Sequence, residues 1–368
     1  MSGPATHLIT IHRSRPLASD PGIGHNRWHP DIPPTLSVEL GETIALETRD
    51  AYDGQIAPST TTADLKHLDA NRIHPLTGPV HVRGAEPGDI LTVEIVEVTP
   101  QTTGFSIASP HFGILRKHLP ESLLVHWFLA AGFATSPQLP NVYIPAEPFM
   151  GLMGVAPSHA MLARFRAMEE RICLSDPLLM WPVEPAGAIP AVAGSGLRTI
   201  PPRDNGGNID VRQLTAGAVL RLPVSVEGAL FSCGDAHYAQ GDNECCTGIE
   251  MGATLICRFG LRKREAAKRS IRDVQFSRPA GPPLAQRPIF ATTGQSYARD
   301  STLRRDDLDQ AAEHALLNMI AHLSAEYGYT VPQAAVVCSV AVDLRISQAA
   351  NTPNYVVSAI LPTDIFVC

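Results

Sequence analysis

Proline is the residue that most restricts how this chain can fold. The chain of 368 residues contains 32 prolines, and several stand in pairs, at positions 33–34, 201–202 and 282–283. Proline has no backbone N–H and a fixed φ, so it interrupts helices and is excluded from the middle of a sheet. Many short strands joined by ordered loops suit this distribution best, and we therefore predict a mainly β protein.

Alternating hydrophobicity locates the best-defined strands. In residues 35–48 apolar side chains occupy the even positions, and Gly41 is placed for a turn, so we expect two strands there. Residues 90–98 also alternate and are partly apolar on both faces, which indicates a buried strand.

The C-terminal third carries the clearest helical pattern. Between residues 307 and 327 apolar side chains recur at steps of three and four. Asp307 stands where an N-cap is expected, and Gly328 follows the last turn. The next segment, residues 334–342, is a continuous apolar run that we predict to be a buried strand.

These patterns together predict an α+β protein dominated by β. We expect a β-sandwich-like body in which a helix packs on a sheet near the C-terminus. The expected parts are an N-terminal arm (residues 1–34), a β-rich body (residues 35–290) and a C-terminal α/β portion (residues 291–368) that completes the same fold.

Charge and cysteine content narrow the class of function. The formal net charge of −7 disfavours a general affinity for nucleic-acid phosphates. No stretch of about 18 apolar residues could span a bilayer, and the N-terminus lacks the basic-then-apolar order of a signal peptide. The seven cysteines include no Cys-x-x-Cys pair, which indicates reduced thiols. We therefore expect a cytoplasmic protein without nucleic-acid or membrane partners.

Residues 234–250 hold the densest group of polar side chains in an apolar neighbourhood. Asp235 and His237 follow the apolar run 228–233, and residues two apart on extended backbone point the same way. Asp, Glu and neutral His can bind a divalent metal, which lowers the pKa of bound water toward ~7 and polarises a carbonyl. Glu244 could shuttle the proton that an amide leaving group needs. The alternative is a purely local hydrogen-bond role for the Asp-x-His pair.

Three further polar residues are candidates for the same site. Asp50 ends an alternating segment, where a functional carboxylate and a turn-capping residue are both reasonable. Asn208 and Asp210 follow two glycines that allow the backbone to approach a ligand closely. An Asx-turn is the alternative role for this pair.

The order of these motifs resembles the acetamidase/formamidase family over nearly the whole chain. The resemblance implies hydrolysis of a small carboxamide such as formamide or acetamide, or of a γ-lactam, by an oligomeric protein. In that family an Asp lies beside the active centre at the position of Asp50. This chain has Asn243 where the family pattern has Gly, which bears on the shape of the pocket. The matching segments are residues 50–55, 77–80, 84–89, 150–157, 206–210, 222–224, 228–231, 234–237, 240–244, 338–348 and 353–354.

We therefore predict an amidohydrolase that uses a metal-activated water. Zinc is the expected cofactor, with calcium as the alternative, and the protein is expected to form a homo-oligomer, a dimer or larger. The expected metal ligands are Asp50, Asp235 and His237, and the expected catalytic residues are Glu244, Asp210 and Asn208.

Two other functions remain open at this point. A thiol amidase would use Cys245 or Cys246 as the nucleophile, although neighbouring carboxylates raise a thiol pKa and disfavour this route. A β-sandwich binding protein without turnover would hold calcium through carboxylate oxygens, but His237 suits zinc better. The histidine-containing run 25–31 either plugs a cavity or an oligomer seam, or acts as a substrate lid.

Overall fold

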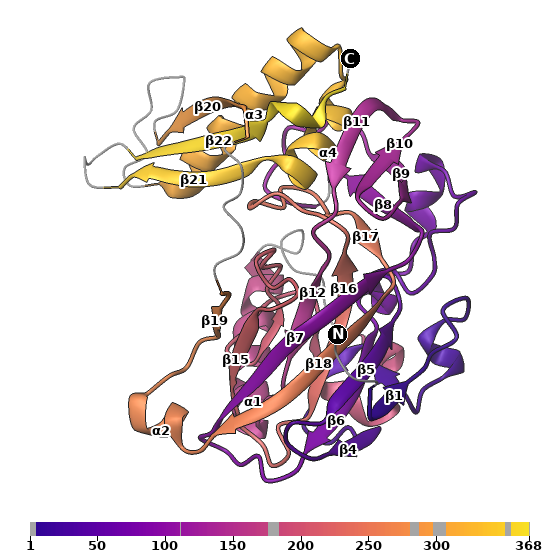
Figure 1. The fold of residues 1–368 in the computed structure, drawn as a ribbon, viewed down its shortest axis with the longest axis vertical. Coiled ribbons are helices and arrows are strands. Elements are labelled where there is room, and N and C mark those ends of the chain that lie inside the picture. The colour runs from indigo at the N-terminus through magenta and orange to yellow at the C-terminus, as the bar shows by residue number, and fades with distance from the viewer. Residues whose placement is uncertain are drawn as a thin grey trace.

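The computed structural model describes residues 5–110, 112–175, 184–279, 287–296, 307–349 and 355–367. Two large β-sheets form the body, and a smaller sheet with two helices lies above them in Figure 1. This arrangement confirms the predicted fold class, a β-dominated α+β protein.

A six-stranded sheet forms one layer of the body. Its strand order is β1-β5-β18-β7-β15-β19, and the neighbouring strands are antiparallel except for β1 and β5. The alternating segment at residues 90–98 is confirmed as the central strand β7. The strands are β1 (His7–Ile9), β5 (Thr43–Thr48), β7 (Ile90–Pro100), β15 (Val219–Pro223), β18 (Ala253–Arg262) and β19 (Gln275–Ser277).

An eleven-stranded sheet forms the second layer. Its main path is β11-β10-β9-β8-β17-β16-β12-β14, and β6 pairs with β16, β2 and β4. The two strands expected in residues 35–48 are confirmed, but they belong to different sheets, because β4 joins this sheet and β5 the other. The strands are β2 (Gly24–His25), β4 (Leu36–Val38), β6 (Leu76–Val82), β8 (Thr103–Ala108), β9 (Leu123–Leu129), β10 (Phe133–Ser136), β11 (Leu139–Pro145), β12 (Phe149–Gly154), β14 (Gly206–Asn208), β16 (Phe231–His237) and β17 (Glu250–Met251).

The two sheets pack face to face over a common apolar core. The rings of Phe231 in β16 and Phe259 in β18 meet edge to face with their centroids 5.1 Å apart, which shows the contact between layers directly. The N-terminal segment joins both layers, since β1 pairs with β5 and β2 pairs with β6. The body is therefore sandwich-like, and residues 5–34 are built into it.

The C-terminal part is a helix packed on a three-stranded antiparallel sheet (Figure 1). Helix α3 (Leu308–Tyr327) begins as expected, with the Asp307 side chain accepting a hydrogen bond from the backbone of Gln310, and ends before Gly328 in a left-handed conformation. This confirms the predicted helix and its caps. The strands, in sheet order, are β20 (Ile289–Gln295), β22 (Val356–Pro362) and β21 (Asp343–Gln348).

The prediction of a strand in residues 334–342 is wrong, because the segment forms helix α4 (Val331–Ala341). Thr330 caps this helix by accepting from the backbone of Gln333, and Pro332 stands in its first turn. Residues on all sides of α4 are buried, so its sequence shows no helical periodicity. The capping box Thr330-x-x-Gln333 was the available signal for a helix.

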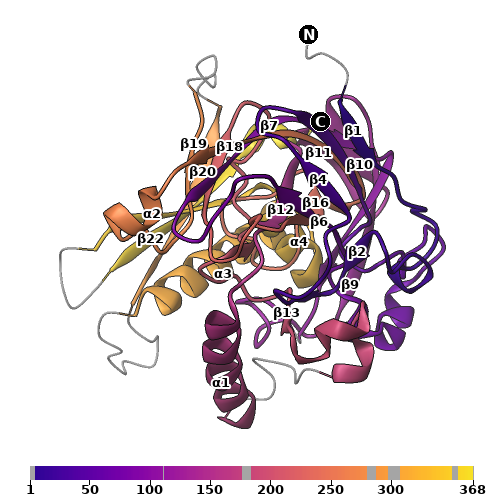
Figure 2. The ribbon, with the colours of Figure 1, turned by 90° about the horizontal axis from the view of Figure 1, so that it is seen from below.

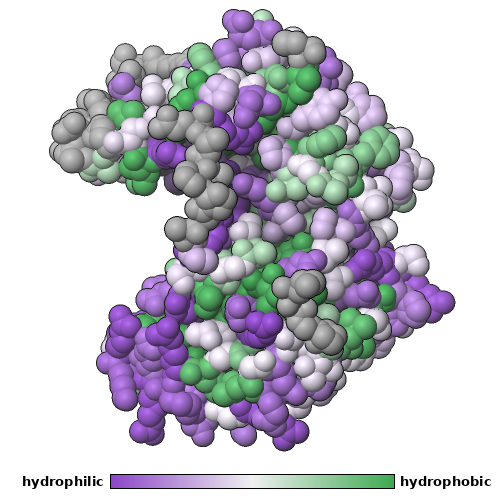
Figure 3. All heavy atoms as spheres, viewed as in Figure 1, coloured by the Kyte–Doolittle hydropathy of each residue, from purple (hydrophilic) through white to green (hydrophobic). Residues whose placement is uncertain are grey.

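The remaining elements lie at the periphery. Helix α1 (His159–Ser175) projects from the body in Figure 2, but its Leu162 and Phe165 share a buried cluster with residues of β6 and β12. Helix α2 (Glu265–Arg269) lies in a hydrophilic part of the surface in Figure 3. Among the described helices, none has the length and apolar character that crossing a membrane requires. Strands β3 (Arg27–Trp28) and β13 (Leu197–Arg198) pair with each other, and the short 3-10 helices span Leu17–Ser19, Thr62–His67, Ala70–Arg72, Pro185–Gly187, Ala191–Ser195 and Thr363–Ile365.

Candidate functional site

Two neighbouring strands, β16 and β17, bring the first three site residues together. His237 ends β16 and stands opposite Glu250, the first residue of β17, in the antiparallel ladder. Residues directly opposite on such a ladder carry their side chains on the same face. The Nε2 atom of His237 lies 3.1 Å from Glu250 Oε1 and 3.6 Å from Asp235 Oδ1. One imidazole and two carboxylates thus surround a single buried point.

The His237 ring is held in one orientation. Its Nδ1 atom lies 2.7 Å from the Gln240 Oε1 atom, which can only accept, so Nδ1 carries a hydrogen. Burial opposes a charge on the ring, but Glu250 and Asp235 raise its pKa well above the usual value, so a metal would bind Nε2 in exchange for a proton. The ring meets Phe149 edge to face, with centroids 5.1 Å apart. It also lies against Gly248, where a Cβ atom would be only 2.7 Å from Nδ1. These contacts aim Nε2 at the carboxylates.

Asp210 and Glu244 form a second group with His237. One polar atom from each of the three side chains lies within 4.8 Å of the others. Asp210, Glu244 and also Asp235 have left-handed backbones, with φ of 45°, 38° and 52°. Such conformations are costly for residues with side chains, and they persist where the surroundings enforce them, often at functional sites. Gly151 makes room for the pair of aspartates, because a Cβ atom there would overlap Asp210 Oδ1 and lie 3.2 Å from Asp235 Oδ2.

The electrostatics separate the carboxylates into two kinds. Burial raises the pKa of Glu244 and of Glu250 to about 8, and burial together with the charge of Glu244 raises the pKa of Asp210 well above its usual value. Burial opposes ionisation of Asp235 as well, but the nearby His74 and His237 lower its pKa. Asp235 is thus the carboxylate that ionises most readily, while burial favours the protonated form of the other three.

Several polar atoms around His237 lack the partners that burial normally demands. Asp235 Oδ1, His237 Nε2 and Glu250 Oε2 are buried and have no hydrogen-bond partner among the described residues. Unsatisfied buried polar atoms are costly, and a cation among them would satisfy all three. One neutral imidazole and two carboxylates match the ligand types of zinc sites. Asp235, His237 and Glu250 therefore fit a divalent metal.

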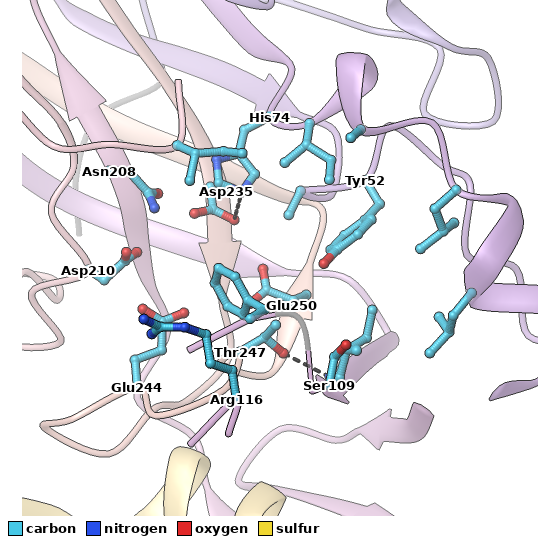
Figure 4. Close-up of a pocket in the computed structure, with 18 of the residues that line it drawn as sticks. Tyr52, His74, Ser109, Arg116, Asn208, Asp210, Asp235, Glu244, Thr247 and Glu250 are labelled. Atoms are coloured by element: carbon cyan, nitrogen blue, oxygen red, sulfur yellow. Dashed lines mark hydrogen bonds and ion pairs between the residues drawn. The ribbon is translucent and has the colours of Figure 1, made fainter. Parts of the chain in front are cut away.

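A large cavity opens onto these side chains (Figure 4). Its volume is about 1220 Å³. In Figure 4, Asp210 and Glu244 lie on one side, Asp235 and Glu250 in the middle, and Tyr52 on the other side. Apolar side chains form much of the remaining lining: Leu65, Leu68, Ile73, Ile107, Phe112 and Ile200.

The structure brings most of the expected site residues together, with one exception. Asn208, Asp210, Asp235 and Glu244 line the cavity, and His237 is buried beside it. Asp50 belongs to neither group of potential ligands found in the described part of the chain.

Asp50 has a structural task instead. Its carboxylate accepts hydrogen bonds from the backbone N–H groups of Tyr52, at 2.8 Å, and of Gly54, at 3.1 Å, and so closes a turn. Among the described residues, the group that contains Asp235 and His237 is completed by Glu250, and Asp50 is not part of it.

Three residues of the site were not identified from the sequence. Glu250 lies beside His237 only because β16 pairs with β17. The length of the loop between these strands does not determine which residues stand opposite each other. His74 lies with its Nε2 atom 4.0 Å from Asp235 Oδ1, and Tyr52 lines the cavity near Glu250. Neither His74 nor Tyr52 stands in a motif whose spacing points to the cluster.

The run 25–31 is ordered structure and lies away from the cavity lining. His25 is buried, with Nε2 2.8 Å from Ser232 Oγ, and His29 is buried with Nε2 3.1 Å from Ser195 Oγ. Neither histidine is among the residues that line the described cavity. These contacts make both histidines part of the packed body.

The cysteines next to Glu244 are poorly placed for nucleophilic attack. Cys245 and Cys246 are each 1% exposed, and neither lines the described cavity. Burial raises the pKa of the Cys245 thiol well above its ordinary value, and its Sγ atom lies 3.7 Å from the carbonyl of Ala335. A thiolate at this position is therefore disfavoured.

Comparison with known proteins identifies the family. The sequence model of the acetamidase/formamidase family matches residues 10–368. The chain belongs to the acetamidase/formamidase family. Among relatives of this family member, the acetamidase of Mycolicibacterium smegmatis is 32% identical over 360 residues, which cover 89% of this chain and 87% of the relative. The formamidase of Methylophilus methylotrophus is 33% identical over 365 residues, covering 93% and 89%.

A solved structure extends this comparison to the fold. The γ-lactamase from Delftia acidovorans superposes with a TM-score of 0.92 at 32% identity, covering 99% of this family member and 94% of the γ-lactamase. The two chains therefore share one architecture from end to end. Family membership makes this chain an amidohydrolase.

Proposed function

We propose that this chain hydrolyses the C–N bond of a carboxamide, linear or cyclic, with a water activated by a divalent metal. The proposed ligands are Asp235, His237 and Glu250. The observation that carries the proposal is the convergence of three buried, unpartnered polar atoms from these side chains on one point beside the cavity. Zinc is the metal proposed first because imidazole suits a borderline cation, and calcium is the alternative.

A divalent cation bound there would lower the pKa of a water molecule and act as a Lewis acid on the amide carbonyl. The chain itself must orient the ligands and move protons. Gln240 fixes the tautomer of His237, as partners of metal-bound histidines commonly do. Asp210 and Glu244 lie within reach of the same ring, and two adjacent buried carboxyl groups readily share one proton. Glu244 takes the proton from the attacking water and passes it to the leaving nitrogen.

Asn208 completes the proposed site on the side of Asp210. It lines the cavity, and its Oδ1 atom is buried without a partner among the described residues. An amide substrate has N–H donors that could satisfy this oxygen, which would orient the leaving nitrogen toward Asp210 and Glu244. Asn208 is thus proposed as a positioning residue.

Two of the relatives support carboxamides as the substrate class, and the third supports cyclic amides. The relatives at 32% and 33% identity are named acetamidase and formamidase, and the superposed structure is named a γ-lactamase. The thiol route is disfavoured by the burial of both cysteines, and a binding protein without turnover is disfavoured by family membership.

The experiment that tests the proposal measures hydrolysis and its dependence on metal. Ammonia release from formamide and acetamide, and ring opening of 2-pyrrolidinone, are followed before and after dialysis against a chelator. We expect turnover that the chelator abolishes and zinc restores, with no effect of a thiol reagent such as methyl methanethiosulfonate. Turnover that survives chelation but is lost with the thiol reagent would reverse the choice of mechanism.

A further inference from the structure

The size of the cavity exceeds what a small amide needs. Its volume of about 1220 Å³ is above the range of about 300 to 1,000 Å³ that is usual for ligand pockets. Acetamide, with one methyl group beside its carbonyl, would leave most of this space to water. A cavity of this size, with apolar side chains gathered on one side of it, points to a substrate with more apolar surface.

One side of the cavity is an apolar wall formed by Tyr52, Leu65, Leu68 and Ile107. These four residues belong to a small hydrophobic cluster that is separate from the main core. The Tyr52 ring meets the ring of Phe105 edge to face, with centroids 5.6 Å apart. Packing of this kind holds the wall in place before any ligand arrives.

The segment that carries Leu65 is also fixed. The 3-10 helix Thr62–His67 begins with a capping box, in which Thr61 and Asp64 satisfy each other's backbone N–H groups. The Thr62 hydroxyl accepts a hydrogen bond of 3.0 Å from the backbone of Leu124 in β9. The wall is therefore a preformed surface that needs no ordering on binding.

The position of the wall indicates that it contacts the acyl part of the substrate. Asp210 and Glu244 lie across the cavity from Tyr52 in Figure 4, and Glu250 lies between them. An amide whose nitrogen faces the proton-carrying Glu244, and whose carbonyl carbon lies beside Glu250, directs its acyl substituent toward the wall.

We infer that the preferred substrates are amides with a bulky apolar acyl group, several carbons larger than the methyl group of acetamide, and that the apolar wall binds this group. The inference rests on the proposed function, because the acyl side is defined by the proton carrier. It goes beyond that function by ranking the substrates.

The test compares kcat/KM for acetamide and cyclohexanecarboxamide, both measured by ammonia release. Each buried methylene contributes a factor of about four. The ring adds five carbons, so partial burial predicts a preference for cyclohexanecarboxamide of about 30-fold or more. A preference for acetamide, or equal values, would overturn the inference while leaving the proposed function intact.

Variants connect the preference to the wall. Leu65→Ala and Leu68→Ala should each lower the ratio of kcat/KM for cyclohexanecarboxamide to that for acetamide by about 5- to 20-fold. Leu40→Ala is the matched control, since Leu40 is 48% exposed and does not line the described cavity. An unchanged ratio in both wall variants would overturn the assignment of the wall.

Binding separates failure of this inference from failure of the proposed function. If neither amide is hydrolysed, the proposed function fails, and calorimetric titration of the same two amides still reports on the wall. Tighter binding of cyclohexanecarboxamide than of acetamide would support the inference. Equal affinities would overturn it.

Discussion

The contact between Gly248 and the His237 ring offers the sharpest single perturbation of the site. A Cβ atom at position 248 would lie 2.7 Å from His237 Nδ1, 2.9 Å from Cγ and 3.1 Å from Cε1. Ordinary contacts begin at 3.4 Å, so Gly248→Ala requires a displacement of about 0.7 Å (3.4 minus 2.7) between the methyl group and the ring. Gly248 has no left-handed backbone, so alanine is compatible with its conformation.

The ring must take up most of this displacement in our account. A misplacement of about 1 Å in a catalytic group can lower the rate by about 100-fold, equivalent to about 2.7 kcal/mol in the activation free energy. We therefore expect Gly248→Ala to lose about 100-fold in kcat/KM for its best amide substrate and to bind zinc more weakly. Overpacking of this kind costs about 1–3 kcal/mol of folding stability, which thermal denaturation will report separately.

A matched control distinguishes the contact from the substitution itself. Gly132→Ala introduces the same methyl group at an exposed position with no atom within 4 Å, and it should leave kcat/KM and zinc affinity unchanged. If Gly248→Ala keeps activity within about twofold of the parent protein, the backbone at position 248 has moved and the His237 ring has not. That result would refute the claim that Gly248 fixes His237 for metal binding.

Three further outcomes follow from the same geometry. Glu244→Gln keeps the shape of the side chain but removes the proton carrier, so we expect a loss of about 10²- to 10⁴-fold in kcat with zinc content unchanged. Loss of zinc in this variant would make Glu244 a ligand. Asp50→Ala removes the acceptor of two backbone N–H groups, so it should lower the free energy of unfolding by about 1–3 kcal/mol. The variant should still bind zinc, and loss of zinc would make Asp50 a ligand. We also expect a homo-oligomer, since Ile289 and Ile346 are 59% and 62% exposed on strands at the edges of the C-terminal sheet, and sedimentation equilibrium showing a monomer at micromolar concentration would contradict this.

Local patterns in the sequence correctly predicted those strands and helices that have a regular apolar period or recognisable caps. The strand at residues 90–98 and the capped helix that follows Asp307 are both present. The strand is less buried than its sequence indicated, because Leu91, Val93 and Ile95 meet the core while Glu94 and Glu97 are exposed. The helix α4 was predicted as a strand because it is buried on all sides, so apolar residues follow one another without a period. Only its N-terminal capping box distinguishes it from a buried strand.

The candidate site was predictable where its residues are neighbours in the chain. Asp235 and His237 share a strand, and their side chains lie together as predicted although the backbone of Asp235 is left-handed. Glu250 lies opposite His237 through strand pairing across a long loop, and no local pattern determines that register. Asp50 was predicted as a ligand because a carboxylate at the end of a strand suits a turn and a metal site equally well.

The central claim is that Asp235, His237 and Glu250 bind a catalytic metal. Elemental analysis of purified protein, with the Glu250→Gln variant alongside, tests it most directly. We predict about one zinc per chain in the parent protein, and a large loss of zinc together with amide hydrolysis in the variant, because a neutral amide replaces an anionic ligand. A parent protein that hydrolyses amides without any bound metal, or a Glu250→Gln variant that retains its full zinc content, would contradict the account.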